Sequence, residues 1–188
     1  MSQTKHRWIF LGVVVGIVLA IDQITKRVIV ANLRNGETHD LIPALSPLFQ
    51  VTRSHNRGAS FGLLPEAGDL FLVIAIVVTG FMLYYYPRIE ADGRTQRLAS
   101  GLIIGGALGN AIDRINYGFV VDFIHYQIPN VISNVSNIAD HAIVLGVILI
   151  FIDSWRAEAA EKNKPDEADE HPQHEDDVYP EEGEHLPY

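Results

Sequence analysis

The sequence contains no cysteine. This absence excludes disulfide bonds, thiolate metal ligands and a cysteine nucleophile. The chain also lacks a His-Glu-x-x-His pattern, and none of its aspartates has a histidine at metal-ligand spacing. We therefore expect neither a metal ion nor another cofactor.

Basic residues are also few. The 188 residues include 14 Lys and Arg against 23 Asp and Glu, which gives a formal net charge of -9. Residues 157–188 hold 12 acidic and 2 basic residues, so residues 1–156 carry a net charge of only +1. Without a basic stripe to neutralise phosphates, nucleic-acid binding is excluded. We expect a near-neutral hydrophobic domain at 1–156 and an acidic, disordered, cytoplasmic tail at 157–188.

Four strongly apolar stretches contain no Asp, Glu, Lys or Arg, and they have 14, 17, 15 and 12 residues. A spanning helix needs about 20 apolar residues, so most of these runs are short when taken singly. Together they indicate a membrane protein, because so small a soluble chain could not bury four helices that are apolar all round. We predict four transmembrane helices centred on Trp8–Ile21, Leu70–Tyr86, Leu98–Ile112 and His141–Ile152.

The orientation of these helices follows from the basic residues of the short flanks. Several basic residues lie in each of three segments: the N-terminus, the link between the second and third runs, and the stretch after the fourth run. The link between the third and fourth runs has only one basic residue, Arg114. Both termini are therefore expected in the cytoplasm. The connection at about 22–69 carries five basic residues, which alone would place it in the cytoplasm. We place it outside nevertheless, because four successive spans must alternate in direction and the other segments agree. The first run lacks a cleavage site after it, so we expect it to stay as an anchor.

The connection between the first two runs is too long for a simple link. Its part from Asn32 to Pro65 mixes Gly, Pro and Asn with β-prone pieces such as Leu48–Thr52. We predict a small strand-rich cap outside the membrane, on the extracytoplasmic side. The mainly α-helical fold class is thus a four-helix membrane domain carrying this cap.

Alternating helices bring four carboxylates to the outer interface: Asp22, Asp113, Asp122 and Asp140. For Asp22 and Asp113, ion pairing is as good an explanation as a functional role. Lys26 follows Asp22 by four residues, and Arg114 is adjacent to Asp113. Asp122 and Asp140 have no basic neighbour in the sequence. Two such carboxylates in a low-dielectric site cannot both ionise cheaply, so one is expected to keep a proton. This arrangement suits a dyad that activates water and polarises a carbonyl.

A second pattern, Gly58-Ala59-Ser60-Phe61-Gly62, matches the G-x-S-x-G motif of serine hydrolases. That motif needs a strand–turn–helix setting in an α/β sheet, which this chain lacks. We interpret Ser60 as a coincidental match. The small residues Gly12 and Gly16, and Gly101, Gly105 and Gly109, recur every four positions and predict close helix packing.

Five segments, taken together, resemble the lipoprotein signal peptidase (signal peptidase II) family. They occur in family order over about residues 8–152: Asp22–Lys26, Asn56–Phe61, Gly105–Arg114, Val120–Phe123 and Asn137–Asp140. The resemblance implies a multi-pass aspartyl endopeptidase of the bacterial inner membrane, active at its extracytoplasmic face. Such enzymes remove the signal peptide before a diacylglyceryl-modified cysteine of a prolipoprotein.

The resemblance also implies roles for individual residues. Asp122 and Asp140 would be the catalytic pair. The residues that would bind substrate or support the site are Asp22, Lys26, Asn56, Gly58, Asn110, Asp113, Arg114 and Asn137. The implied partners are a lipid-modified prolipoprotein and membrane lipid, and we expect a monomer.

The chain departs from the family pattern at the outer rim. Ser136 stands where an aromatic residue is common, His141 where a small one is usual, and Gln127–Val135 is unusually polar.

Two other functions would use the carboxylates at the outer interface. A proton or cation transporter would need acidic residues at the midplane and a path to both sides, and an assembly factor would tolerate the loss of both aspartates.

Overall fold

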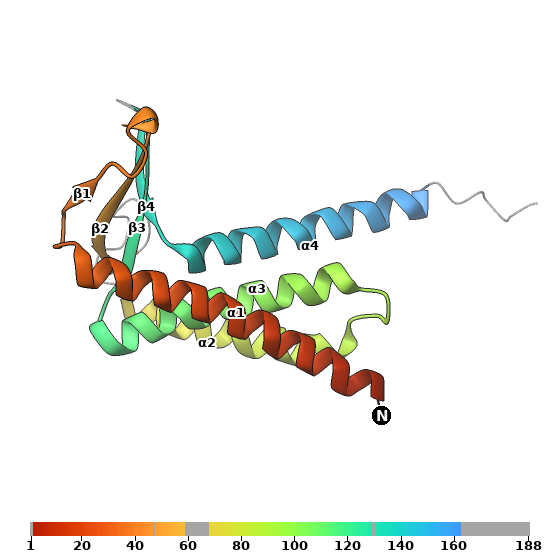
Figure 1. Cartoon of the computed structure of the whole chain (residues 1–188). Helices are drawn as coiled ribbons and strands as arrows, with labels where there is room; N and C mark the ends of the chain where they lie inside the picture. The colour runs from red at the N-terminus through yellow and green to blue at the C-terminus, as the bar shows by residue number, and fades with distance from the viewer. Residues whose placement is uncertain (1, 47, 59–67, 129–130, 163–188) are drawn as a thin grey trace, which may run out of the picture.

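The computed structural model describes residues 2–46, 48–58, 68–128 and 131–162. Four long helices run side by side, and a small sheet stands at one end of them (Figure 1). Each of the four apolar runs lies in one helix, except that Tyr86 begins the short 3-10 helix η3 (Tyr86–Arg88). All four predicted segments are helical: α1 (Ser2–Asn32), α2 (Gly68–Tyr85), α3 (Arg94–Tyr117) and α4 (Ile138–Lys162).

Three of these helices, α1, α2 and α4, are long and apolar enough to cross a membrane. They leave many large apolar side chains exposed, among them Ile9, Val77 and Phe151. Such exposure is costly in water and is expected for a surface that faces lipid. Helix α3 differs because it is packed against the other three and is rich in buried small and polar residues.

Glycines on α3 allow its neighbours to approach closely. A Cβ atom at Gly101 would lie 2.6 Å from a side-chain carbon of Val14, and one at Gly105 would lie 2.7 Å from Val18. The predicted close packing of α3 is therefore confirmed. The same prediction is wrong for Gly12 and Gly16 on α1, where a Cβ would meet no atom of the described chain within 4 Å.

The sheet is larger than predicted. Its four antiparallel strands stand in the order β1–β2–β3–β4. Two come from the expected cap and two from the link between α3 and α4, where no strands were predicted. The pairing with β2 gives the third strand its partner, which the sequence of that link alone does not show. The strands are β1 (Thr38–His39), β2 (Phe49–Asn56), β3 (Val120–Ile128) and β4 (Ile132–Ser136).

The first connection is shorter than predicted. We placed its start at Asp22, but α1 continues to Asn32. The charge of Asp22 does not end the helix, because Lys26 neutralises it one turn later inside the bundle. Arg53 of β2 donates hydrogen bonds to the carbonyls of Val30 and Leu33 at the end of α1, at 3.3 and 2.8 Å. A guanidinium is favourable there because carbonyls without helical partners gather at a helix C-terminus.

Two features place β3 beside the end of α3. Gly118 ends α3 in the left-handed conformation, with φ of 73°, and its N–H donates to the carbonyl of Arg114. A glycine adopts this conformation without the steric cost of a Cβ. In β2 the register with β3 shifts between Val51 and Ser54, so that Ser54 stands opposite Asp122. A bulge of this kind redirects side chains locally.

At the other end of the chain, α4 continues to Lys162, so the first residues of the predicted tail are helical. The part of the tail at 163–188 lies outside the described residues, as does Ser60 of the hydrolase-like motif. The tail's predicted disorder is therefore not tested.

We expect Gly106→Ala to destabilise the helix bundle. The new Cβ would collide with the backbone carbonyl oxygen of Ala139 and would lie 2.7 Å from Ile143 Cγ1, so α3 and α4 would have to separate. Overpacking of this kind costs about 1–3 kcal/mol. The melting temperature in detergent should fall by several degrees. The matched control is Gly80→Ala on α2, where no atom lies within 4 Å, and an equal loss in both variants would contradict the packing argument.

Candidate active site

A buried lysine joins two carboxylates from different helices. Lys26 Nζ lies 2.9 Å from Asp22 Oδ2 and 2.9 Å from Asp113 Oδ2. It also donates to Asn110 Oδ1 at 3.0 Å. The two aspartates and the lysine are at most 2% exposed. Charges removed from water in this way are tolerated only when they are paired and hydrogen-bonded.

The same two carboxylates hold the chain segments that carry the other site residues. The backbone N–H of Ala139, at the start of α4, donates to Asp22 Oδ1 at 3.0 Å. The N–H of Val121 in β3 donates to Asp113 Oδ2 at 3.0 Å. The ion cluster of Asp22, Lys26 and Asp113 therefore fixes the positions of the residues next to Ala139 and Val121.

Those residues are Asp140 and Asp122, and three asparagines surround them. Asn137 lies between the carboxylates: its side-chain amide donates to Asp122 Oδ1 at 2.6 Å and its backbone N–H to Asp140 Oδ2 at 3.3 Å. Asn56 donates to Asp122 Oδ2 at 2.8 Å, and Asn110 to Asp140 Oδ1 at 2.7 Å. Asn137 Oδ1 also caps α4 by accepting the N–H of Asp140 at 2.9 Å.

The two carboxyl groups differ in their surroundings. Asp122 is 2% exposed, whereas Asp140 is half-buried. Burial first, and then the negative charge of Asp140, raises the pKa of Asp122 from 3.8 to about 7. The hydrogen bonds from Asn56 and Asn137 act in the opposite direction but do not outweigh the burial. A carboxyl group that keeps its proton near neutral pH can serve as a general acid.

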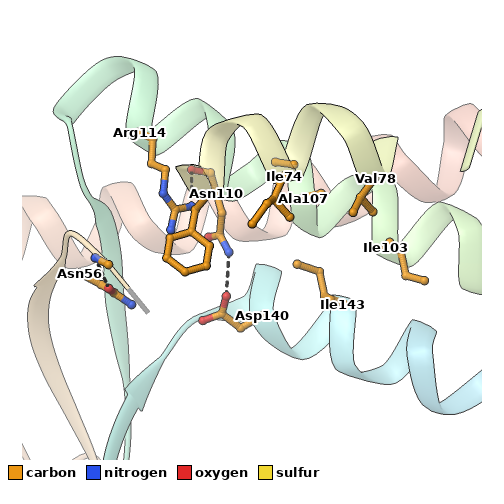
Figure 2. Close-up of a pocket in the computed structure, with 12 residues that line it drawn as sticks. Asn56, Ile74, Val78, Ile103, Ala107, Asn110, Arg114, Asp140 and Ile143 are labelled. Atoms are coloured by element: carbon orange, nitrogen blue, oxygen red, sulfur yellow. Dashed lines mark hydrogen bonds between the residues drawn. The ribbon is translucent and has the colours of Figure 1, made fainter. Parts of the chain in front are cut away.

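Asp140 opens onto a pocket of about 310 Å³ between α2, α3 and α4 (Figure 2). One end of this pocket is polar and is formed with Asn56, Asn110 and Arg114. Its remaining wall is apolar and includes Phe71, Ile74, Ala75, Val78, Ile103, Ala107 and Ile143. A cavity that joins an apolar wall to a few convergent polar groups has the character of a ligand site.

The structure brings all ten residues of the sequence prediction into one region. Gly58 also lines the pocket, and its backbone N–H donates to Asn56 Oδ1 at 3.0 Å. One expected pairing is wrong: Asp113 pairs with Lys26 and not with Arg114. Arg114 instead faces the pocket, with its guanidinium carbon 5.3 Å from the centre of the Phe71 ring. Neighbouring residues on a helix point in different directions, so adjacency in the sequence misled here.

Sequence reasoning missed two kinds of site residue. Gln23 donates to Asp22 Oδ2 at 3.1 Å and to Asp113 Oδ1 at 3.0 Å, yet no role was assigned to it. Its place inside the segment Asp22–Lys26 was the available signal. The apolar wall from α2, including Phe71, gave no signal, because a residue that faces a pocket and one that faces lipid look alike in an apolar run.

The two single-residue departures from the family pattern lie at the edge of the site. His141 is exposed, and its ring bonds the Asn137 carbonyl oxygen at 2.6 Å and the Tyr126 hydroxyl at 2.8 Å. Ser136 ends β4, and its hydroxyl donates to the Ile124 carbonyl oxygen at 3.5 Å. Neither lines the pocket beside Asp140. Among the described residues, no group of three or more His, Cys, Asp and Glu side chains is placed to hold a metal ion.

We expect Lys26→Met to be strongly destabilising. It would leave Asp22 and Asp113 buried without a counter-charge, and breaking a buried ion pair in this way costs about 3–5 kcal/mol. The melting temperature and the yield of folded protein should both fall sharply. Arg27→Met is the control, because Arg27 is adjacent but exposed. The melting temperature should recover when Asp22→Asn and Asp113→Asn are added to Lys26→Met. A Lys26→Met variant as stable as the wild type would contradict the proposed role of the ion cluster.

Comparison with known proteins agrees with this geometry. Residues 14–156 match the Signal peptidase (SPase) II family. The chain is 41% identical over 146 residues to a lipoprotein signal peptidase of Halothermothrix orenii, covering 78% of this chain and 95% of the relative. It is 40% identical over 152 residues to that of Anoxybacillus flavithermus, covering 81% and 89%.

Solved structures of bacterial membrane enzymes have a similar fold. A bacterial membrane enzyme solved at 2.3 Å resolution superposes with a TM-score of 0.72 at 31% identity, covering 82% of this chain and 93% of its own. A second, solved at 1.9 Å, has a TM-score of 0.65 at 31% identity, covering 82% and 94%. The chain is therefore a membrane-embedded peptidase that belongs to the signal peptidase II family.

Proposed function

We propose that this protein cleaves the signal peptide from diacylglyceryl-modified prolipoproteins, and that Asp122 and Asp140 are its catalytic residues. The observation that carries the proposal is the pair of carboxyl groups, one buried and one open to the pocket, held by a shared asparagine. Membership of the signal peptidase II family and the likeness to lipoprotein signal peptidases support the substrate class.

The different surroundings of the two aspartates suggest how they divide the chemistry. Asp140 faces the pocket and, when ionised, would take a proton from the attacking water. Asp122, with its raised pKa, would hold the proton that polarises the scissile carbonyl oxygen. Attack then gives a tetrahedral intermediate without a covalent enzyme adduct. Return of a proton to the amine releases the signal peptide.

The pocket also fits a substrate that is anchored in the membrane. Its apolar wall lies between α2, α3 and α4, next to the polar end that contains Asp140. A diacylglyceryl group partitions into lipid by about 0.8 kcal/mol for each buried CH₂. The lipid would therefore hold the cleavage point at the depth of the carboxyl pair. A transporter would need acidic groups along a path through the bundle, whereas these lie together at its sheet end.

Four membrane spans and an outward-facing site complete the proposal. Helix α3 has 24 residues, which is about 36 Å of helix and enough to cross a bilayer. Its lower apolar content is explained by its central position, because it faces protein on most sides. Basic residues at the end of the bundle away from the sheet favour cytoplasmic termini in the bacterial inner membrane, with the site at the extracytoplasmic face.

The first test replaces each aspartate in turn. Asp122→Asn and Asp140→Asn should each lower the cleavage rate of a lipidated precursor by at least about 100-fold, because each removes one proton-transfer group. Cleavage is measured by gel shift in detergent. Melting temperatures should stay close to that of the wild type.

The control for this test is Asp153→Asn on α4. Asp153 accepts a hydrogen bond from Gln96 at 2.7 Å, and an asparagine oxygen can keep that bond. It should cleave as the wild type does. An unlipidated precursor serves as the second control and should be a poor substrate. Near wild-type activity in either catalytic variant would reject the dyad, and equal rates on both precursors would reject the role of the lipid.

The pH profile gives an independent test. Because the pKa of Asp122 is raised to about 7, its protonated form is lost as the pH rises through that value, and the cleavage rate should fall with it. The free energy of unfolding should change in the same direction. The stabilising contribution of protonated Asp122 is complete below about pH 4 and is lost as the pH rises through about 7. Melting temperature measured from pH 5 to 9 should decline for the wild type and change less for Asp122→Asn. A cleavage rate that still increases above pH 8 would contradict the assignment of Asp122 as the acid.

A further inference from the structure

A second pocket lies at the end of the bundle away from the sheet, far from the carboxyl pair. It has a volume of about 590 Å³ and is lined by residues of α1, of the link after η3 and of the start of α3. Three of its residues are arginines and one is an aromatic. The lining residues are His6, Arg7, Phe10, Ala91, Arg94 and Arg97.

Among the described residues, no carboxylate forms an ion pair with any of the three guanidinium groups. Arg97 is 8% exposed and donates to the backbone carbonyls of Glu90 and Ala91, each at 2.8 Å. Arg7 donates to the backbone carbonyl of Ile89 at 3.2 Å.

This arrangement differs from that of the other buried cation, Lys26, which has two carboxylates. The backbone carbonyls orient Arg7 and Arg97 but supply only partial charge. Several guanidinium groups gathered around one cavity form a site for an oxyanion, because each can donate two parallel hydrogen bonds to phosphate oxygens.

An apolar face of α1 leads away from the same pocket. Phe10, Val13 and Ile17 are three and four residues apart, so they lie on one side of the helix. Their exposed fractions are 42%, 53% and 54%. An acyl chain could lie along this face while a headgroup occupied the pocket. An inorganic anion would use the guanidinium groups but not the apolar face.

We propose that this pocket binds the phosphate headgroup of an anionic membrane lipid, with an acyl chain against Phe10, Val13 and Ile17. The lipid would join α1 to the link before α3 at the end of the bundle where no sheet connects the helices. Basic pockets between membrane helices commonly bind anionic headgroups in this way. The proposed site is separate from the carboxyl pair, so it does not depend on the proposed catalytic mechanism.

The test titrates the full-length protein in neutral detergent with short-chain phosphatidylglycerol and follows the melting temperature, which ligand binding raises by mass action. We expect a saturable rise. Arg94→Gln should increase the half-saturating lipid concentration about fivefold, as expected for one lost cation at a lipid site. Arg94 is the residue to change because it is exposed, whereas Arg7 and Arg97 donate hydrogen bonds to backbone carbonyls of the link. An unchanged titration curve for Arg94→Gln would overturn the proposal.

Arg156→Gln is the matched control, since Arg156 is an exposed arginine near the same end of the bundle and does not line the pocket. It should leave the half-saturating concentration unchanged, and a fivefold effect there too would mean general charge attraction and would overturn the site. Phosphatidylcholine of equal chain length and inorganic phosphate should both bind more weakly. Binding of inorganic phosphate as tight as that of phosphatidylglycerol would overturn the lipid assignment in favour of a free-anion site.

The test must also distinguish the lipid from an acidic segment of this chain, residues 163–188, as the occupant of the pocket. A full-length variant with four acidic residues neutralised separates the two cases. If the lipid occupies the pocket, this variant should bind phosphatidylglycerol as the wild type does. Much tighter binding by the variant would show that the segment occupies the site and would overturn the proposal. The four changes are Asp176→Asn, Asp177→Asn, Glu181→Gln and Glu182→Gln.

Discussion

The buried contact of Lys26 with Asp22 and Asp113 is the interaction on which the rest of the site depends. It joins α1 to α3, and the same two carboxylates accept the backbone N–H groups of Ala139 and Val121. A buried ion cluster adds little net stability, because desolvation offsets most of the attraction. Its effect is geometric: it determines where β3 and α4 begin relative to the helices, and thereby where the two remaining aspartates lie.

Close helix packing makes this contact possible. Gly109 on α3 leaves room for Asp22, since a Cβ there would lie 2.7 Å from Asp22 Oδ2 and 3.3 Å from the Cβ of Ala139. The absence of a side chain at Gly109 thus lets both α1 and α4 approach α3 at the level of the site. Asn110, the next residue, bonds both Lys26 and Asp140. The small residues of α3 and its polar residues therefore act together, the first by admitting the neighbours and the second by bonding to them.

The sequence predicts the helices and the site residues better than it predicts the sheet. Long apolar runs identify each helix, and the motifs around Asp22, Asp113, Asp122 and Asp140 select residues that the structure brings together. Strand β3 was missed because its pairing with β2 joins segments more than sixty residues apart, and β4 was missed with it because it pairs with β3. The partner of Asp113 was missed for a similar reason: Lys26 lies on another helix, and only packing shows that it is nearer than Arg114.

The contrast between the two charged regions follows from what each must accommodate. At the sheet end, Lys26 is matched by carboxylates and every member is nearly inaccessible, so that cluster has no free charge for a ligand. The carboxyl group of Asp140 beside it remains half-open to a pocket. At the opposite end, Arg7 and Arg97 are oriented by neutral carbonyls, which leaves their charge available. Among the described residues, the buried charge of Lys26 is therefore neutralised by ion pairs, whereas the charged groups beside the two pockets, Asp140 at one end and Arg7 and Arg97 at the other, form none.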